Sequence, residues 1–232
     1  MGIPSKINHN AFLPYKNKFQ NNKVVICGNG PSLNEYKIID DAIHIGCNRC
    51  IYYDKLIFDI YFYNDWLKAT QNYRTDILNY KPKMCKFFGT FPASRQYGCT
   101  QEIASLGEAI LYDIEGPGSC GPISTYQKDI DTYYVGDYGM SIVFVMMQFA
   151  LYSGCKNIYI AGCDITNINN KNINERYFIN HPNVSNYSDH PDLLLKWSKM
   201  KNFISKYYRD VNIYTINPLG LKGYFTDIFQ QQ

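Results

Sequence analysis

Residues 141–164 read SIVFVMMQFALYSGCKNIYIAGCD, and this stretch decides the class of fold. Its first part is an apolar run from Ser141 to Gly154, which predicts a buried helix with serine before its first turn and glycine after its last. The second part, NIYIA at 157–161, predicts a buried β-strand that ends in Gly-Cys-Asp. A helix that leads directly into a buried strand is typical of a parallel sheet whose strands alternate with helices.

The same alternation extends along the chain in both directions. Strands are predicted at residues 23–28, 42–47, 57–63, 84–88 and 211–216, and helices at 33–39, 66–80 and about 190–208. The sequence therefore predicts an α/β fold with one doubly wound parallel sheet.

Three segments lack such a pattern. Residues 1–22 are predicted to be an N-terminal arm that precedes a single domain at 23–232. Residues 90–137 are rich in glycine, proline and serine, so we expect loops and short elements there. Residues 165–189 are rich in asparagine and are predicted to form a long excursion. A connection of that length is usually functional, such as a lid, or disordered.

The overall composition is that of one ordinary soluble domain. Of the 232 residues, 46% are hydrophobic and 19% are charged, with a formal net charge of +3. No apolar run approaches the roughly 18 residues of a membrane span, and residues 1–22 lack the apolar core of a secretory signal, so we expect a cytoplasmic protein. The small net charge argues against nucleic acid as the main partner and favours a small or partly charged ligand.

The eight cysteines are predicted to be reduced. Several lie within apolar strand-like runs, where free thiols act as small buried hydrophobic groups. Cys47 and Cys50 form a C-x-x-C pair, but a zinc site normally needs a second such pair or two spaced histidines. We therefore expect no metal site at this pair.

Three predicted strands are followed by asparagines, namely Asn29, Asn48 and Asn64. In a doubly wound sheet, ligands bind beyond the carboxyl ends of the strands, where these residues would lie. An amide offers donors and an acceptor without a charge, which suits a base, a ribose or a sugar ring. Asparagine also favours turns and caps, and each residue taken singly fits that role. Three at equivalent positions favour a ligand-binding edge.

The turn GNGPS at 28–32 contains two glycines, Gly28 and Gly30, which would let the backbone approach a phosphate or a sugar closely. It is not a dinucleotide fingerprint, because G-x-G-x-x-G would place glycine where Leu33 stands, and the chain has no G-x-x-x-x-G-K-[ST] motif. Ser141 can hold an anion with its hydroxyl and the helix N-terminus, or act as an ordinary helix cap.

Together these residues resemble a known family. CGNGPSL at 27–33, CN at 47–48, FYN at 62–64, and Ser141 leading through a helix to IYIAGCD at 158–164 resemble the bacterial sialyltransferases that decorate lipooligosaccharide. The resemblance covers residues 23–221, with a poor match at 90–137. GNGPSL is also shared with a wider Rossmann-like group that includes archaeal pterin pyrophosphokinases, whereas Asn48 and Asn64 favour the transferases.

The resemblance implies one Rossmann-like domain that binds CMP-sialic acid under a mobile lid at about 165–189. The donor-binding residues that it implies are Gly28, Asn29, Gly30, Asn48, Asn64 and Ser141. It also implies a single displacement that inverts the anomeric centre, with a histidine as general base on the acceptor hydroxyl. His190 matches that histidine, and a helix N-terminus beside it would disfavour the protonated ring. His181 is the reserve candidate.

The sequence departs from the family pattern in two places. In the family, a tyrosine that steadies the departing CMP phosphate follows the aspartate after the central strand, and Thr166 stands there in this chain. Tyr177 or Tyr187 could supply the hydroxyl, although neither matches by spacing. The basic residue that the family carries shortly before the serine is absent from this chain, which has Asp137 and Tyr138 in that part of the sequence. These departures affect the prediction of which donor is bound more than they affect the prediction of the fold.

Other functions stay open at this point. Asp129 and Asp131 form a D-x-D pair, which many metal-dependent glycosyltransferases use to hold Mn²⁺ or Mg²⁺ against a nucleoside diphosphate. A CMP donor leaves as a phosphate monoester with less charge, so for that donor we expect no metal and no cofactor. The fold would also suit a Mg²⁺-dependent pyrophosphokinase-like phosphotransferase, or a non-catalytic module that binds nucleotide or glycan.

The expected partners are a CMP-sugar donor and a glycan or glycolipid acceptor. A glycolipid acceptor would bring the protein into peripheral contact with the inner face of the membrane. A homo-oligomer is also compatible with the sequence.

Overall fold

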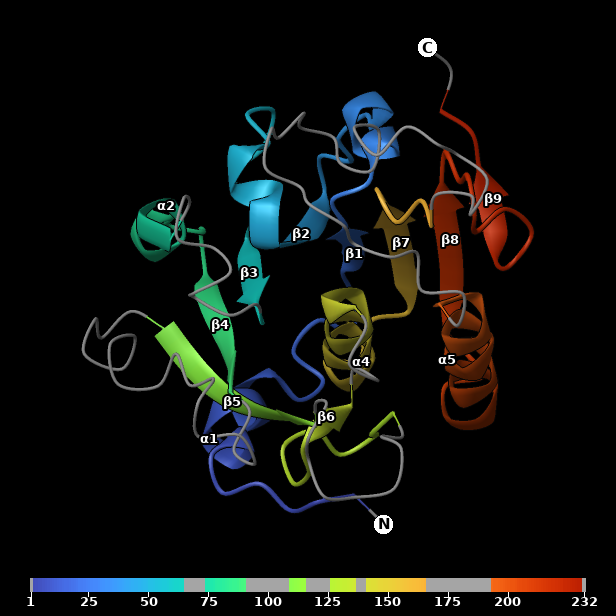
Figure 1. Ribbon diagram of the computed structural model, residues 1–232. Helices are drawn as coiled ribbons and strands as arrows, with labels where there is room; N and C mark the ends of the chain where they lie inside the picture. The colour runs from blue at the N-terminus through green and yellow to red at the C-terminus, as the bar shows by residue number, and fades with distance from the viewer. Residues whose placement is uncertain are drawn as a thin grey trace.

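The computed structural model describes residues 2–64, 74–90, 109–115, 126–136, 141–165 and 193–230. Within them, one sheet of parallel strands forms the centre of the molecule (Figure 1). The strands are β1 (Lys23–Cys27), β2 (Ala42–Cys47), β3 (Ile60–Tyr63), β4 (Cys85–Thr90), β5 (Ala109–Glu115), β6 (Val135–Gly136), β7 (Asn157–Ala161), β8 (Asn212–Ile216) and β9 (Thr226–Ile228).

The order of the strands reverses beside β1. Across the sheet the order is β6-β5-β4-β3-β2-β1-β7-β8-β9, so the chain first builds one side of β1 and then crosses to the other. Lys23 of β1 lies level with Ala42 of β2 and Asn157 of β7, and the carboxyl ends of these strands share one edge. The doubly wound α/β fold is thus confirmed, with its switch point between β1 and β7, where such sheets bind ligands.

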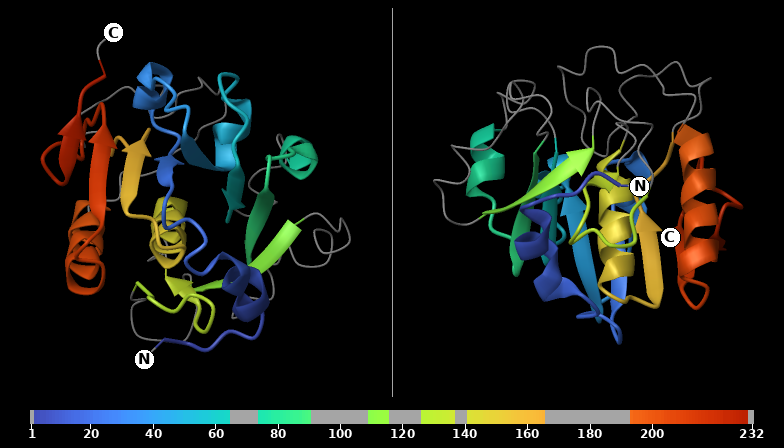
Figure 2. Two further views of the ribbon diagram at one scale, coloured as in Figure 1. Left: turned by 180° about the vertical axis from the view of Figure 1, so that it is seen from behind. Right: turned by 90° about the horizontal axis from the view of Figure 1, so that it is seen from below.

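The described helices are short except for two. They are α1 (Asn8–Phe12), η1 (Leu13–Tyr15), η2 (Pro31–Glu35), η3 (Asn48–Tyr52), α2 (Arg74–Asn79), α4 (Ile142–Tyr152) and α5 (Leu193–Tyr207), where η marks 3₁₀ helices. Figure 2 shows α4 and α5 lying side by side along the sheet. None of the helices in the described ranges has the length and apolar character needed to cross a bilayer.

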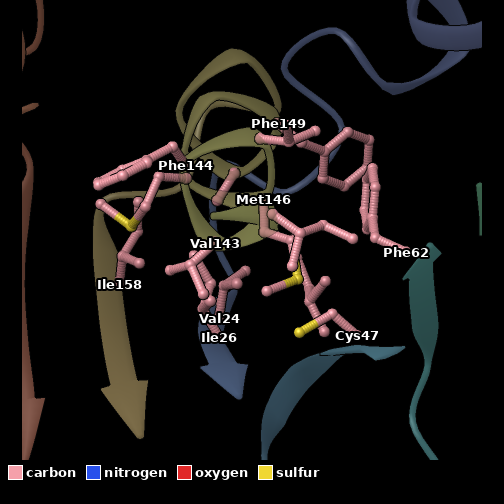
Figure 3. Packing of buried hydrophobic residues seen from close by; sticks show 14 of the residues in the cluster. Val24, Ile26, Cys47, Phe62, Val143, Phe144, Met146, Phe149 and Ile158 are labelled. Carbon is pink, nitrogen blue, oxygen red and sulfur yellow. The ribbon is translucent and has the colours of Figure 1, made fainter. Parts of the chain in front are cut away.

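Helix α4 is the centre of the hydrophobic core. Every residue of α4 is buried, as its uniformly apolar sequence predicts. Figure 3 shows Val143 directed towards Ile26 of β1 and Phe149 beside Phe62 of β3, where the two rings lie 5.3 Å apart. Trp197 of α5 covers another side of the helix. Because it is enclosed in this way, α4 holds its N-terminus at a fixed place relative to the strands.

Two predictions about local structure are wrong. The helix expected at 33–39 is instead the short η2, after which the chain extends from Tyr36, whose hydroxyl lies 2.8 Å from the His44 ring. Residues 90–137 were expected to hold only loops and short elements, but the described part includes the full strand β5. Strand β5 was missed because Asp113 interrupts its apolar pattern. The side chain of Asp113 is buried against the hydroxyls of Ser5 and Thr90.

The predicted N-terminal arm packs against the sheet over residues 2–22. Phe12 is fully buried in the main hydrophobic core. The buried side chain of Asn8 accepts a hydrogen bond from Asp113 N–H (2.6 Å) and donates to the carbonyls of Asp113 (3.1 Å) and Tyr133 (2.8 Å). This segment therefore contributes to the stability of the sheet on which the site is built.

Candidate functional site

Two tight turns meet at the switch point, one after β1 and one after β7. Gly28 N–H donates to the Ala161 carbonyl (2.8 Å), and Gly30 N–H donates to the Gly162 carbonyl (2.7 Å). A Cβ on Gly28 would lie 2.4 Å from the Gly162 oxygen, and a Cβ on Gly30 would lie 2.4 Å from Asp164 Oδ2. Glycine is therefore required at both positions by contact between the turns, before any ligand is considered.

Asp164 fastens the two turns together. Its carboxylate, only 4% exposed, accepts hydrogen bonds from the backbone N–H of Ser32 (2.7 Å) and from the Ser32 hydroxyl. Burial raises the pKa of the Asp164 carboxyl, while these two hydrogen bonds act in the opposite direction. Asp164 was not among the site residues predicted from the sequence, although an aspartate three residues after the end of a buried strand is a visible signal.

Asn29 lies half-buried between two thiols. Its amide NH₂ donates to Cys47 Sγ (3.4 Å), and its oxygen lies 3.5 Å from the Cys50 thiol. The Cys50 thiol is also 3.4 Å from the Cys27 carbonyl. Burial raises the pKa of Cys27 well above its ordinary value, so this thiol is unreactive near neutral pH. The cysteines in the described ranges form no disulfide bonds, as predicted for them.

Asn48 begins η3 in the left-handed region, with φ of 45°. Asparagine adopts this conformation more readily than most residues. The Tyr61 hydroxyl donates to the Asn48 carbonyl (2.7 Å) and holds the turn in place. The side-chain Oδ1 of Asn48 is buried and has no hydrogen-bond partner in the part of the chain that the structure describes. The residue thus fills a turn position and also presents an unused acceptor.

Asn64 directly follows β3 and is 9% exposed. Its Oδ1 accepts a hydrogen bond from the Tyr112 hydroxyl of β5. Its Nδ2 is buried and, within the described ranges, has no partner. More than about 90% of buried polar groups in proteins are hydrogen-bonded. Unpaired amide atoms on both Asn48 and Asn64, each just after a strand of one sheet, therefore mark this edge as a candidate ligand site.

Ser141 caps helix α4. Its Oγ accepts a hydrogen bond from Val143 N–H (3.3 Å), so the structure shows the cap role that the sequence left open. An N-terminal cap does not prevent anion binding, because the helix dipole places partial positive charge at the same end of the helix.

Several predicted site residues lie outside the described residues. They are His190, Thr166 and Tyr177, together with His181, Tyr187, Asp137, Tyr138 and residues 166–189 of the expected lid. Their roles stay predictions.

The D-x-D pair lies away from Ser141. Asp131 neighbours Tyr152, the last residue of α4, and burial together with this carboxylate raises the pKa of the Tyr152 phenol. Helix α4 is about 16 Å long at about 1.5 Å per residue, which separates this pair from the helix N-terminus. No group of three or more His, Cys, Asp or Glu side chains in the described ranges is arranged to hold a metal ion.

Neither a family model nor a curated protein matches this sequence. The solved structures with a similar fold include two of one sialyltransferase and one of another glycosyltransferase. The sialyltransferase CstII from Campylobacter jejuni in complex with cytidine-5'-monophosphate has a TM-score of 0.50 and 17% identity, over 90% of this chain and 85% of that one. CstII in complex with the substrate analogue CMP-3FNeuAc has a TM-score of 0.51 and 17% identity, over 89% and 86%.

The third is the MAf glycosyltransferase from Magnetospirillum magneticum AMB-1, with a TM-score of 0.56 and 12% identity. The match covers 96% of this chain but 37% of that one, so this chain corresponds to only part of the MAf protein. This chain therefore shares its Rossmann-like fold with a sialyltransferase and with part of a second glycosyltransferase.

Proposed function

We propose that this protein is an inverting, metal-independent glycosyltransferase that moves sialic acid, or a related sugar, from a CMP donor to a hydroxyl of a glycan acceptor. The observation that carries the proposal is a pair of buried amide atoms, Asn48 Oδ1 and Asn64 Nδ2, at the carboxyl edge of the sheet, neither of which has a hydrogen-bond partner among the described residues. An unsatisfied buried polar group costs about 1–3 kcal/mol. A ligand with both a donor and an acceptor would remove that cost at both atoms.

The proposed donor follows from the fold and from the chemistry of the edge. CstII, whose fold this chain shares, has been solved with CMP and with CMP-3FNeuAc. The side chains of Asn29, Asn48 and Asn64 are uncharged, which suits a nucleotide sugar with a single phosphate. We assign the phosphate to the N-terminus of α4 at Ser141, where the positive end of the helix dipole favours an anion.

In the proposed reaction, His190 removes the proton from the acceptor hydroxyl. The acceptor oxygen then attacks the anomeric carbon from the side opposite CMP, and the bond from that carbon to the phosphate oxygen breaks. The electron pair of that bond leaves with CMP, and the configuration is inverted. Thr166 or Tyr177 would donate a hydrogen bond to the departing phosphate. A phosphate monoester carries little enough charge for this arrangement to act without a metal.

The test is turnover of CMP-sialic acid by the unmodified protein and by His190→Ala and Asn48→Ala. Loss of a general base lowers turnover by about 10²–10⁴-fold, so His190→Ala should bind CMP and release almost no product. Asn48→Ala should weaken CMP binding. Asn157→Ala is the matched control, because Asn157 begins β7 at the opposite end of the strands. Equal turnover in all four proteins would refute the assignment.

Thermal-shift measurements with CMP, CDP, UDP and ATP plus Mg²⁺ test the class of donor. A ligand that binds only the folded state raises the melting temperature. We expect the largest rise in melting temperature with CMP. If only the combination of ATP and Mg²⁺ raised the melting temperature, the result would instead indicate a phosphotransferase.

We further propose that the protein acts in the cytoplasm, in lipooligosaccharide biosynthesis, at the inner face of the membrane. A glycolipid acceptor would account for that location. Transfer to soluble oligosaccharides with none to lipid-linked acceptors would contradict it.

A further inference from the structure

The side chain of Asn64 accepts a hydrogen bond from a tyrosine on a strand that is not adjacent to β3. Asn64 follows β3, Tyr112 belongs to β5, and β4 lies between these two strands. We propose that Tyr112 is a positioning residue of the donor site, which fixes the Asn64 amide with its oxygen inward and its NH₂ towards the ligand. This inference rests on the proposed function of the asparagine edge.

Strand register explains how the two side chains meet. Tyr63 pairs with Phe88, and Gly89 pairs with Tyr112, so Asn64, Gly89 and Tyr112 form one row across three strands. A Cβ at Gly89 would lie 2.5 Å from Asn64 Oδ1. Because glycine has no side chain, the Tyr112 hydroxyl can reach across β4 and donate to Asn64 Oδ1.

The Tyr112 ring is itself fixed by packing. It is fully buried and makes edge contacts with the rings of Phe12 (5.3 Å), Phe62 (5.8 Å) and Phe87 (6.2 Å). Three rings from three segments therefore limit the movement of the phenol. The hydroxyl is held in place before a ligand arrives, so little ordering entropy has to be lost on binding.

The Tyr112 hydrogen bond decides which polar atom the ligand meets. With Oδ1 engaged, Asn64 Nδ2 has no partner in the described ranges. An amide that could rotate freely would offer either an acceptor or a donor. The fixed amide offers only N–H at this position. The bound CMP-sugar must therefore present a hydrogen-bond acceptor there, such as a carbonyl, hydroxyl or phosphate oxygen.

A double-mutant cycle tests the inference, with CMP-3FNeuAc as the probe and calorimetry as the measurement. Tyr112→Phe removes the hydroxyl and keeps the ring. We expect it to weaken binding by about fivefold to tenfold, the contribution of one hydrogen bond. In the Asn64→Ala background, the same change should alter the dissociation constant by less than about twofold, because its target is gone.

Two further variants separate positioning from general damage. Tyr80→Phe is the control, because it also removes a tyrosine hydroxyl that takes part in a hydrogen bond. The Tyr80 hydroxyl accepts from Phe58 N–H (3.0 Å), just before β3 begins. This variant should leave binding unchanged. Gly89→Ala closes the gap through which Tyr112 reaches Asn64. It should weaken binding in the native background and much less in the Asn64→Ala background, which keeps the test valid if Tyr112→Phe folds poorly.

The outcomes are distinct. Equal weakening by Tyr112→Phe in both backgrounds, or none in the native one, overturns the positioning role and leaves the donor assignment intact. Failure of the unmodified protein to bind CMP-3FNeuAc overturns the proposed donor and the inference with it.

Discussion

Replacing Asp164 with alanine should destabilise the protein more than the loss of any exposed carboxylate. The change leaves the buried N–H and hydroxyl of Ser32 without their acceptor. Hydrogen bonds to a charged group contribute about 1.5–3 kcal/mol each. Burial of the carboxylate, which raises its pKa, offsets part of that sum. We therefore expect a loss of about 3 kcal/mol in the free energy of unfolding, the balance of these effects.

Urea unfolding followed by circular dichroism measures this loss. With an m-value of about 3 kcal/mol/M, the midpoint should fall by about 1 M at unchanged slope. Asp227→Ala is a matched control, because Asp227 also accepts from one hydroxyl, that of Thr215 (2.7 Å), and from one backbone N–H, that of Gly223 (2.9 Å). Asp227 is half-buried on the edge strand β9, where water can replace the lost acceptor.

The comparison of the two aspartates gives a clear refutation. If Asp164→Ala costs less than about 0.5 kcal/mol, or no more than Asp227→Ala, then Asp164 does not fasten the turns at the switch point.

Two further predictions concern the folded state. Asn8→Ala removes three hydrogen bonds to Asp113 and Tyr133, two of them fully buried, and should cost about 3 kcal/mol, a fall of about 6–12 °C in the melting temperature. An unchanged melting temperature would show that these hydrogen bonds do not stabilise the packing of the N-terminal segment on the sheet. Burial lowers the pKa of His44, while the facing carboxylate of Asp59 acts in the opposite direction. The unfolded state then takes up a proton more readily as the pH falls below about 6.5, so the urea midpoint should fall between pH 7.5 and 5.5, and less in His44→Gln. A fall of the same size in both proteins would refute this.

Local sequence patterns were sufficient for the strands at the switch point. Residues 24–27 of β1 and 158–161 of β7 are continuous apolar runs, and β2 is interrupted only by His44, as is typical of strands inside a parallel sheet. The run at 142–152 is too long for a typical strand, and it is followed two residues later by Gly154, whose φ is +81°. The asparagines that follow β2 and β3 could be placed at the ligand edge because a parallel sheet aligns its carboxyl ends.

Contacts between distant segments could not be read in the same way. Tyr112 lies 48 positions from Asn64, and their contact depends on the register of β3, β4 and β5. The glycines of the first turn suggested a close approach to a ligand, but the nearest group is the Gly162 turn, more than 130 residues later. In both cases the decisive partner is fixed by tertiary structure and leaves no local signal.

The most direct test of the proposed donor site is a crystal structure of the protein with CMP-3FNeuAc. We predict that an acceptor atom of the analogue lies within about 3.2 Å of Asn64 Nδ2 and a donor atom within about 3.2 Å of Asn48 Oδ1, as hydrogen bonds require. An analogue bound elsewhere, with both amide atoms still unpaired, would contradict the assignment of this edge as the donor site.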